Sequence, residues 1–261
     1  MQNERTFRVL ALLLFLGSMF ALVTFLIKGS PVFVSIPFLG FALVVCTAEV
    51  GKRYGKAAGI WFVLLYAALV LFLMRVPYAS SMDLSIAFLS FPFFWDAELQ
   101  HRSLEKTFSY LGLKKDGFIM DAIWGVATTL LLVGPLVIME AIVVVFLLHL
   151  EEPGKVSMLM GGLPWYILIF SFTIAPIAEE VFFRGFLLSR FGVVISTVLF
   201  TAAHYSYGSL TESLAAFTAG LIFALLCRRR KSVIPSIFAH ATFNFINVAM
   251  VILYYWFKVI K

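Results

Sequence analysis

The chain has 261 residues and a formal net charge of +6, and 62% of its residues are hydrophobic whereas 13% are charged. A soluble domain is about half apolar and about a quarter charged, so this composition argues against a soluble enzyme, a disordered protein or a nucleic-acid-binding domain. The mean hydropathy of +1.01 points to a polytopic membrane protein instead. A spanning helix needs roughly 20 apolar residues, so we expect an all-α transmembrane helix bundle with about eight spans.

Three apolar runs near the N-terminus are long enough to span a bilayer, namely residues 7–27, 31–50 and 57–74. The first is too long for a signal peptide, so we expect a helix that stays in the membrane. The next segment, residues 78–100, has a short apolar core that contains Pro92. Such a core is typical of a re-entrant or interfacial piece.

Residues 103–116 are polar and basic, which predicts a loop or a surface helix. Five further apolar stretches follow along the chain, namely residues 118–150, 163–188, 193–207, 214–227 and 233–257. Pro135 is expected to kink the first of them. Because neither a repeat nor a linker interrupts the sequence, we expect one integral membrane domain over residues 1–261.

Basic residues gather in short loops between these stretches, and the firmest cluster is Arg228–Lys231 before the last span. Lys and Arg collect in cytoplasmic loops and near anionic lipid headgroups. We therefore expect membrane lipid and no nucleic acid as their partner, with the N-terminus inside if residues 78–100 return the chain across the bilayer. Cys46 and Cys227 lie in apolar stretches without metal-site spacing, so we expect inert thiols.

Ionisable residues inside apolar spans are expensive and are functional candidates by default. Glu180 and Arg184 are four residues apart, so they share a helix face and are expected to pair. Glu179 points about 100° away and is left free to face a cavity. His240 and Asn244 also share a face.

Depth along the helices places these groups at a similar level. With a rise of about 1.5 Å per residue, Glu179 lies roughly 16 Å from the basic loop at Arg190. His204 lies roughly 18 Å and His240 roughly 13 Å from the loops that precede their helices. Three helices are therefore expected to bring polar groups together from one side.

A carboxylate with a histidine can deprotonate a water, and a second histidine with an amide can donate to an oxyanion. This set suits amide hydrolysis. The same Glu and His residues could instead bind Zn²⁺. The sequence does not contain the zinc-protease motif HExxH. It also lacks the nucleophile motif GxSxG, so catalysis by a serine nucleophile is not supported.

Three short motifs resemble the CPBP family of intramembrane proteases, which includes the Rce1-type CaaX prenyl endopeptidases. They are EExxxR at Glu179–Arg184, FxxxH at Phe200–His204 and HxxxN at His240–Asn244. The resemblance covers about residues 163–247, which would form the catalytic core helices. It implies a membrane protease of about eight helices with a cavity open to the cytoplasmic side.

The resemblance also implies roles for individual residues. Glu179 and His204 would activate water, while His240 and Asn244 would stabilise the oxyanion. Glu180 and Arg184 would support Glu179. The glutamate account, with no metal or other cofactor, is favoured over a zinc site because sequence spacing cannot show three ligands converging on one ion.

The resulting expectation is an endopeptidase that cuts near the C-terminus of a membrane-tethered substrate, with prenylated CaaX proteins as the implied class. A non-catalytic membrane scaffold or regulator of the same family is the alternative. A proton- or ion-coupled transporter ranks last because no internal repeat is visible.

Overall fold

The computed structural model describes residues 100–143, 160–204 and 209–259. It also describes short stretches nearer the N-terminus, namely residues 47–48, 51–52, 55–61, 63–64, 85, 88–89, 91–93 and 95–96. The predicted span 7–27 and most of the predicted spans 31–50, 57–74 and 78–100 lie outside the described residues. Those predictions, and the topology of residues 78–100, stay predictions.

The chain divides into two compact units, residues 1–107 and residues 108–261. All elements with described bounds are helices, namely α5 (Leu104–Tyr110), α6 (Phe118–Ile142), α8 (Trp165–Phe172), α9 (Ile174–Glu180), the π-helix η3 (Val181–Leu187), α10 (Leu188–His204), α11 (Leu210–Arg230) and α12 (Ile234–Val259). The short helix α5 fits the predicted surface helix. The expectation of one integral membrane domain stays a prediction.

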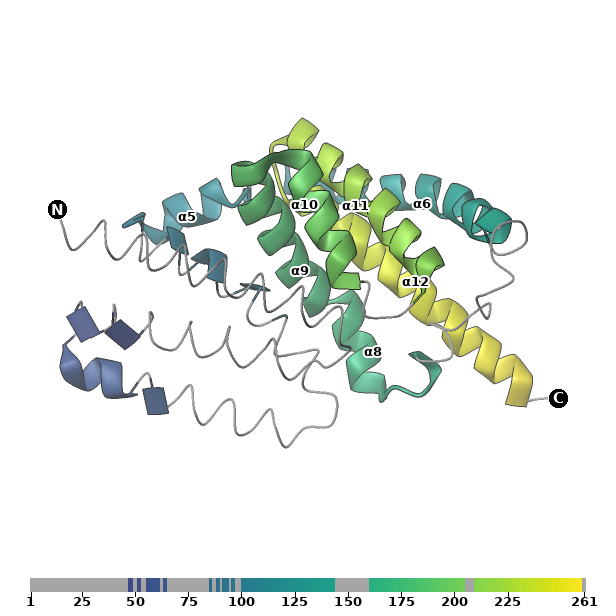
Figure 1. Ribbon diagram of the computed structural model, residues 1–261, viewed down its shortest axis with the longest axis horizontal. Helices are drawn as coiled ribbons and strands as arrows, with labels where there is room; N and C mark the ends of the chain where they lie inside the picture. The colour runs from purple at the N-terminus through teal and green to yellow at the C-terminus, as the bar shows by residue number, and fades with distance from the viewer. Residues whose placement is uncertain are drawn as a thin grey trace. The chain divides into compact units, whose positions relative to one another are not determined.

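Four helical stretches in the described part are long and apolar enough to cross a membrane, namely Phe118–Met139, Trp165–His204, Leu210–Arg230 and Ile234–Tyr254. The all-helical class is thereby confirmed, and the total of about eight spans stays a prediction. Within the second unit, α12 lies beside α6 and α11, and α10 lies beside α11 (Figure 1).

The longest stretch, residues 165–204, is not one straight helix. It consists of two helical arms that pack against each other, the first before Gly192 and the second after it. Gly192 has φ 81° and ψ 178°, which breaks the helix inside α10. Ser196 Oγ donates to the carbonyl of Phe183 at 2.7 Å, although residues this far apart in a straight helix would be separated by about 20 Å. The chain therefore reverses at Gly192, between the predicted spans 163–188 and 193–207.

The first arm is itself interrupted, and a new helix, α9, begins after the interruption. Thr173 separates α8 from α9, and Pro176 lies in the first turn of α9. Proline is tolerated there because the first-turn N–H groups have no partner within the helix. The π-helix η3 then follows Glu180 directly, and its seven residues are all buried. Single π-turns of this kind occur frequently at functional sites.

Helix α11 has clear signals at both ends. Ser209 caps its N-terminus and accepts a hydrogen bond from the backbone N–H of Glu212 at 3.2 Å. The last turn holds Arg228, Arg229 and Arg230, where positive charge favours the helix dipole. Arg230 Nε also donates to Asp121 of α6 at 2.8 Å, which joins the ends of α6 and α11.

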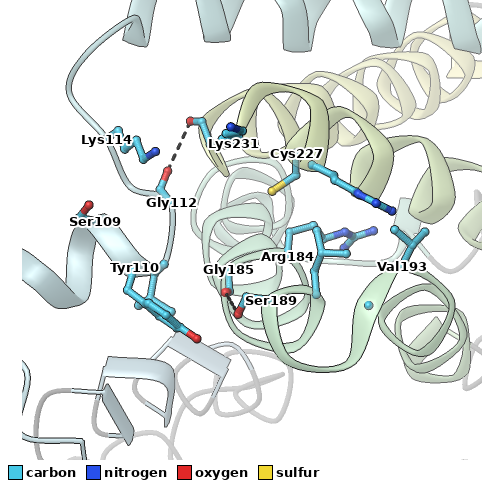
Figure 2. A pocket seen from close by; sticks show the side chains of 15 residues that line it. Ser109, Tyr110, Gly112, Lys114, Arg184, Gly185, Ser189, Val193, Cys227 and Lys231 are labelled. Atoms are coloured by element: carbon cyan, nitrogen blue, oxygen red, sulfur yellow. Dashed lines mark hydrogen bonds between the residues drawn. The ribbon is translucent and has the colours of Figure 1, made fainter.

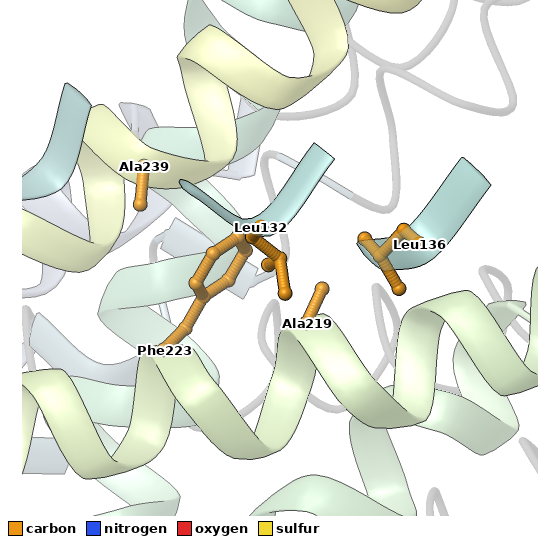
Figure 3. Packing of buried hydrophobic residues seen from close by; sticks show 5 residues of the cluster. All are labelled: Leu132, Leu136, Ala219, Phe223 and Ala239. Carbon is orange, nitrogen blue, oxygen red and sulfur yellow. The ribbon is translucent and has the colours of Figure 1, made fainter. Parts of the chain in front are cut away.

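A buried cluster joins α6, α11 and α12, and it consists of Leu132, Leu136, Ala219, Phe223 and Ala239 (Figure 3). The alanines leave room for the helix backbones to approach closely.

Helices α6 and α12 meet with almost no space between their backbones. Thr129 Oγ1 donates to the carbonyl of Ala239 at 2.6 Å. A Cβ added at Gly125 would lie 2.3 Å from the carbonyl oxygen of Pro235. The crossing of these two helices therefore depends on glycine at position 125.

Candidate active site

Three helices of the second unit bring ionisable groups to one place. Glu179 comes from α9, His204 from the end of α10 and His240 from α12. Each offers a ligand atom, and these atoms lie within 4.8 Å of one another. The expectation that three helices bring their polar groups together is thereby confirmed.

Glu179 and His204 face each other across a short gap. Glu179 Oε2 is 3.9 Å from His204 Nε2, which is too long for a direct hydrogen bond. That carboxylate oxygen is buried and has no hydrogen-bond partner among the described residues. The side chains of Glu179 and His204 are 20% and 15% exposed, so the gap keeps some access from outside.

A backbone hydrogen bond fixes which nitrogen of His204 faces the glutamate. His204 Nδ1 lies 2.9 Å from the carbonyl oxygen of Phe200, one turn earlier in α10. A carbonyl oxygen only accepts, so Nδ1 carries the proton. In the neutral ring, Nε2 is then the acceptor nitrogen, and it is the His204 atom that lies 3.9 Å from Glu179 Oε2.

Glu180 is fully buried and has a different set of partners. Its Oε1 accepts from Arg184 Nη1 at 2.8 Å, as the spacing of four residues predicts. The same oxygen accepts from His240 Nδ1 at 2.9 Å. This second bond was not predicted, because the sequence grouped His240 with Asn244 on α12 and gave no sign of its partner on α9.

Arg184 is 2% exposed and is held on several sides. Its Nη2 donates to the carbonyl of Gly220 at 3.1 Å. Its guanidinium carbon lies 4.0 Å from the ring centroid of Phe200, a favourable cation–π distance. A Cβ at Gly220 would come within 2.9 Å of Phe200 and 3.4 Å of Arg184 Nη2, so this glycine makes the room for both.

Asn244 lies one helical turn beyond His240 and connects α12 to α8. Its Nδ2 donates to the backbone carbonyl of Ser171 at 2.8 Å. One of its two N–H groups is therefore committed to this contact. The structure thus brings ligand atoms of Glu179, His204 and His240 within 4.8 Å of one another, while Asn244 is held by the neighbouring helix.

Two partners of the site were missed by sequence reasoning, Gly220 and Ser171. Both contribute backbone carbonyl oxygens, which every residue type offers, so the residue type gives no signal. Phe223, whose ring centroid lies 5.7 Å from that of His240, resembles an ordinary core residue in the sequence. The side chain of Glu140, another carboxylate in an apolar span, lies outside the described residues.

The donor set of the cluster also fits a divalent transition metal. Glu179, His204 and His240 would hold the ion, because a carboxylate with two imidazoles is a common catalytic zinc set. The Nδ1 atoms of both histidines are engaged, one with a carbonyl and the other with a carboxylate. Metal-binding histidines are typically oriented by such bonds. Sequence spacing could not show this convergence.

The long apolar helices with ionisable groups buried among them define the class: the chain is a multi-pass helical membrane protein. Both arms of residues 165–204, helix α11 and the first half of α12 fall within one family match. Residues 161–246 match the family described as type II CAAX prenyl endopeptidase, Rce1-like. These residues are thus similar to the Rce1-like family, and they are nearly the stretch that carries the sequence resemblance. Neither the curated proteins nor the solved structures gave a match.

Proposed function

We propose that the protein is an intramembrane endopeptidase that hydrolyses a peptide bond near the C-terminus of a membrane-tethered substrate of the prenylated CaaX type. The observation that carries this proposal is the gap between Glu179 Oε2 and His204 Nε2, 3.9 Å wide. Both atoms are acceptors when the histidine is neutral, and Glu179 Oε2 is buried without a hydrogen-bond partner among the described residues. A water placed between them would donate to both.

In this mechanism Glu179 is the general base. The water gives one proton to the Glu179 carboxylate as its oxygen attacks the carbonyl carbon of the scissile peptide. His204 Nε2 orients the water by accepting its second hydrogen. When the C–N bond of the tetrahedral intermediate breaks, Glu179 returns the proton to the leaving amine.

The oxyanion of that intermediate needs hydrogen-bond donors. Nδ1 of His240 is engaged with Glu180, so only the imidazolium form of His240 offers an additional donor, at Nε2. The second N–H of the Asn244 amide is a further donor, since the first is bound to Ser171.

Glu180 and Arg184 act as positioning residues in this proposal. Their ion pair is fully buried and reaches His240 on one side and the backbone of α11 on the other. A buried pair of this kind holds its neighbours in one geometry when its hydrogen bonds are made. It fixes His240 relative to α9, the helix that carries Glu179.

The family match and the location of the cluster support the proposed substrate class. The Rce1-like family consists of prenyl endopeptidases of CAAX substrates. A cluster among apolar helices suits a peptide whose lipid anchor lies in the bilayer beside it. We propose that the cavity opens toward the cytoplasmic side.

The test is cleavage of a quenched, farnesylated CaaX peptide by the purified protein in liposomes. Glu179→Gln keeps the side-chain shape and removes the base, so we expect turnover to fall at least about a hundredfold, the scale of general-base catalysis. Lys115→Gln, a change at an exposed residue that does not belong to the cluster, is the control and should keep wild-type turnover. Wild-type activity in Glu179→Gln would overturn the mechanism.

A chelator separates the two ways of activating the water. We expect cleavage to persist after treatment with a zinc chelator. Loss of activity that added Zn²⁺ restores would instead assign Glu179, His204 and His240 as metal ligands. No cleavage by the wild-type protein would contradict the prenylated substrate and favour the non-catalytic scaffold.

A further inference from the structure

A second feature of the same unit lies beyond the Glu–His cluster, at the end formed by its basic loops. A cavity of about 520 Å³ opens there. It is bounded by the loop that follows α5, by the chain reversal at Gly192 and by the end of α11 (Figure 2). These three segments are far apart in the sequence, so only the fold creates the cavity.

Positive charge gathers among the described residues around this cavity. Four cationic side chains line it, Lys114, Arg184, Arg228 and Lys231. No acidic side chain is among the described residues of its lining. Lys114, Arg228 and Lys231 are exposed, and the described part of the chain gives none of them an ion-pair partner. The described lining of the cavity therefore carries a net positive charge.

The fourth cation gives the cavity a buried donor. Arg184 is 2% exposed, and two of its nitrogens are bound to Glu180 and to the carbonyl of Gly220. Its third nitrogen, Nε, is buried and has no hydrogen-bond partner among the described residues. A buried donor without an acceptor is costly in free energy. An anion bound in the adjacent cavity would provide an acceptor for Arg184 Nε.

Apolar surface also lines the cavity, beside the hydroxyl groups of Ser109, Ser189 and Ser232. Tyr110, Leu188 and Val193 contribute hydrocarbon surface between the cationic groups. A small inorganic anion would leave this surface in contact with water. An amphiphile with a charged head and a hydrocarbon body fits both parts of the wall, which favours a lipid over a soluble ion.

We propose that this cavity binds a phosphate group carried by an anionic phospholipid. Basic pockets between transmembrane helices at the membrane surface recognise such headgroups. Lys114, Arg228 and Lys231 hold the phosphate oxygens, and the apolar wall accepts the glycerol and upper acyl chain. Arg184 connects this site to Glu180, so the lipid lies one side chain away from the proposed catalytic cluster.

The experiment is native mass spectrometry of the full-length protein in detergent, titrated with phosphatidylglycerol, with phosphatidylcholine or with glycerol 3-phosphate. The site variant is Lys114→Gln with Arg228→Gln. The matched control is Lys115→Gln with Arg229→Gln, which removes the same charge from adjacent, exposed residues that do not line the cavity. None of these residues belongs to the proposed catalytic machinery.

We expect the wild type and the control to retain one phosphatidylglycerol, and the site variant to bind it about tenfold more weakly. Phosphatidylcholine and glycerol 3-phosphate should bind at least about tenfold more weakly than phosphatidylglycerol to the wild type. Equal weakening in both variants would overturn the site, because it would reflect surface charge alone. Binding of glycerol 3-phosphate as tight as that of the lipid would overturn the lipid as the source of the phosphate.

A further measurement tests a second kind of anion, the C-terminal carboxylate of a peptide. If a peptide with a free C-terminal carboxylate displaced the phosphatidylglycerol while its C-terminal amide did not, the cavity would be a peptide-terminus site and the proposal would be overturned. We expect neither peptide to displace the lipid.

Discussion

Two adjacent glutamates of the same helix have opposite environments. Glu180 is fully buried and accepts hydrogen bonds from Arg184 and His240. Glu179 is 20% exposed, and its Oε2 has no hydrogen-bond partner in the described part of the chain. Adjacent helical residues point about 100° apart, which is enough to send one carboxylate into an ion pair and the other toward His204. A single EE dipeptide thus supplies both a structural and a candidate reactive group.

At this scale we predict that Glu180→Gln destabilises the protein while Glu179→Gln does not. Removing the Glu180 charge leaves the Arg184 guanidinium buried without its counter-ion, which costs about 3–5 kcal/mol. Glu179 makes no direct hydrogen bond through Oε2 that the amide would lose. Thermal unfolding in detergent should show a clear fall in Tm for Glu180→Gln and a Tm near wild type for Glu179→Gln. Equal shifts would contradict this division.

Gly220 gives a second prediction for single residues. A Cβ added at Gly220 would lie 2.9 Å from the Phe200 ring and 3.4 Å from Arg184 Nη2. Gly220→Ala should therefore displace Phe200 and Arg184, and with Arg184 the side chain that orients Glu180. We expect a loss of about 1–3 kcal/mol in stability, together with lower turnover. Arg184→Lys offers a comparison, since it keeps the charge but lacks the planar fork and should also lose activity. Wild-type turnover in both variants would show that this contact does not position the cluster.

At the scale of helices, close packing of α6 against α12 helps to hold His240 in position. His240 is on the same helix as Pro235 and Ala239, which contact α6 through Gly125 and Thr129. Because the contact is made by backbone and small side chains, the helices have little freedom to adjust. The position of His240 therefore depends on a helix that lies outside the family match of residues 161–246.

Two glycines of α6 provide a matched test of this packing. A Cβ at Gly125 would meet the Pro235 carbonyl at 2.3 Å, whereas a Cβ at Gly134 would meet nothing within 4 Å. We expect Gly125→Ala to lower stability by about 1–3 kcal/mol. Gly134→Ala should be neutral or stabilising by up to about 1 kcal/mol, since alanine is the better helix former. Thermal unfolding in detergent measures both, and equal effects would contradict a specific α6–α12 contact.

At the scale of the whole molecule, the orientation in the membrane is a prediction from charge. The basic end of α11, Arg228–Lys231, precedes the last span, and the positive-inside rule puts it in the cytoplasm. In a background with Cys46→Ser and Cys227→Ser, Arg229→Cys should resist a membrane-impermeant maleimide added to intact cells. It should react once the membrane is permeabilised. Labelling in intact cells would reverse the orientation.

Much of the fold and site of the described part could be predicted from residue types. The apolar runs 118–150 and 214–227 correspond to α6 and α11, although the helices have different ends. Hydrophobicity marks a span well, but the ends of a helix depend on caps such as Ser209. The Glu180–Arg184 pair follows from spacing along one helix. The partner of His240 could not be predicted because it lies 60 residues away on another helix.

The sequence by itself determined that this is a helical membrane protein and which ionisable residues stand in its spans. Composition and spacing are properties of a segment, and a helix in lipid must satisfy its backbone internally whatever its neighbours. Only the tertiary structure decided that Glu179, His204 and His240 converge, that Glu180 joins Arg184 to His240, and that three basic segments enclose a cavity. Each of these depends on how separate helices pack, and packing is set by shape, with glycines at 125 and 220 allowing the contacts.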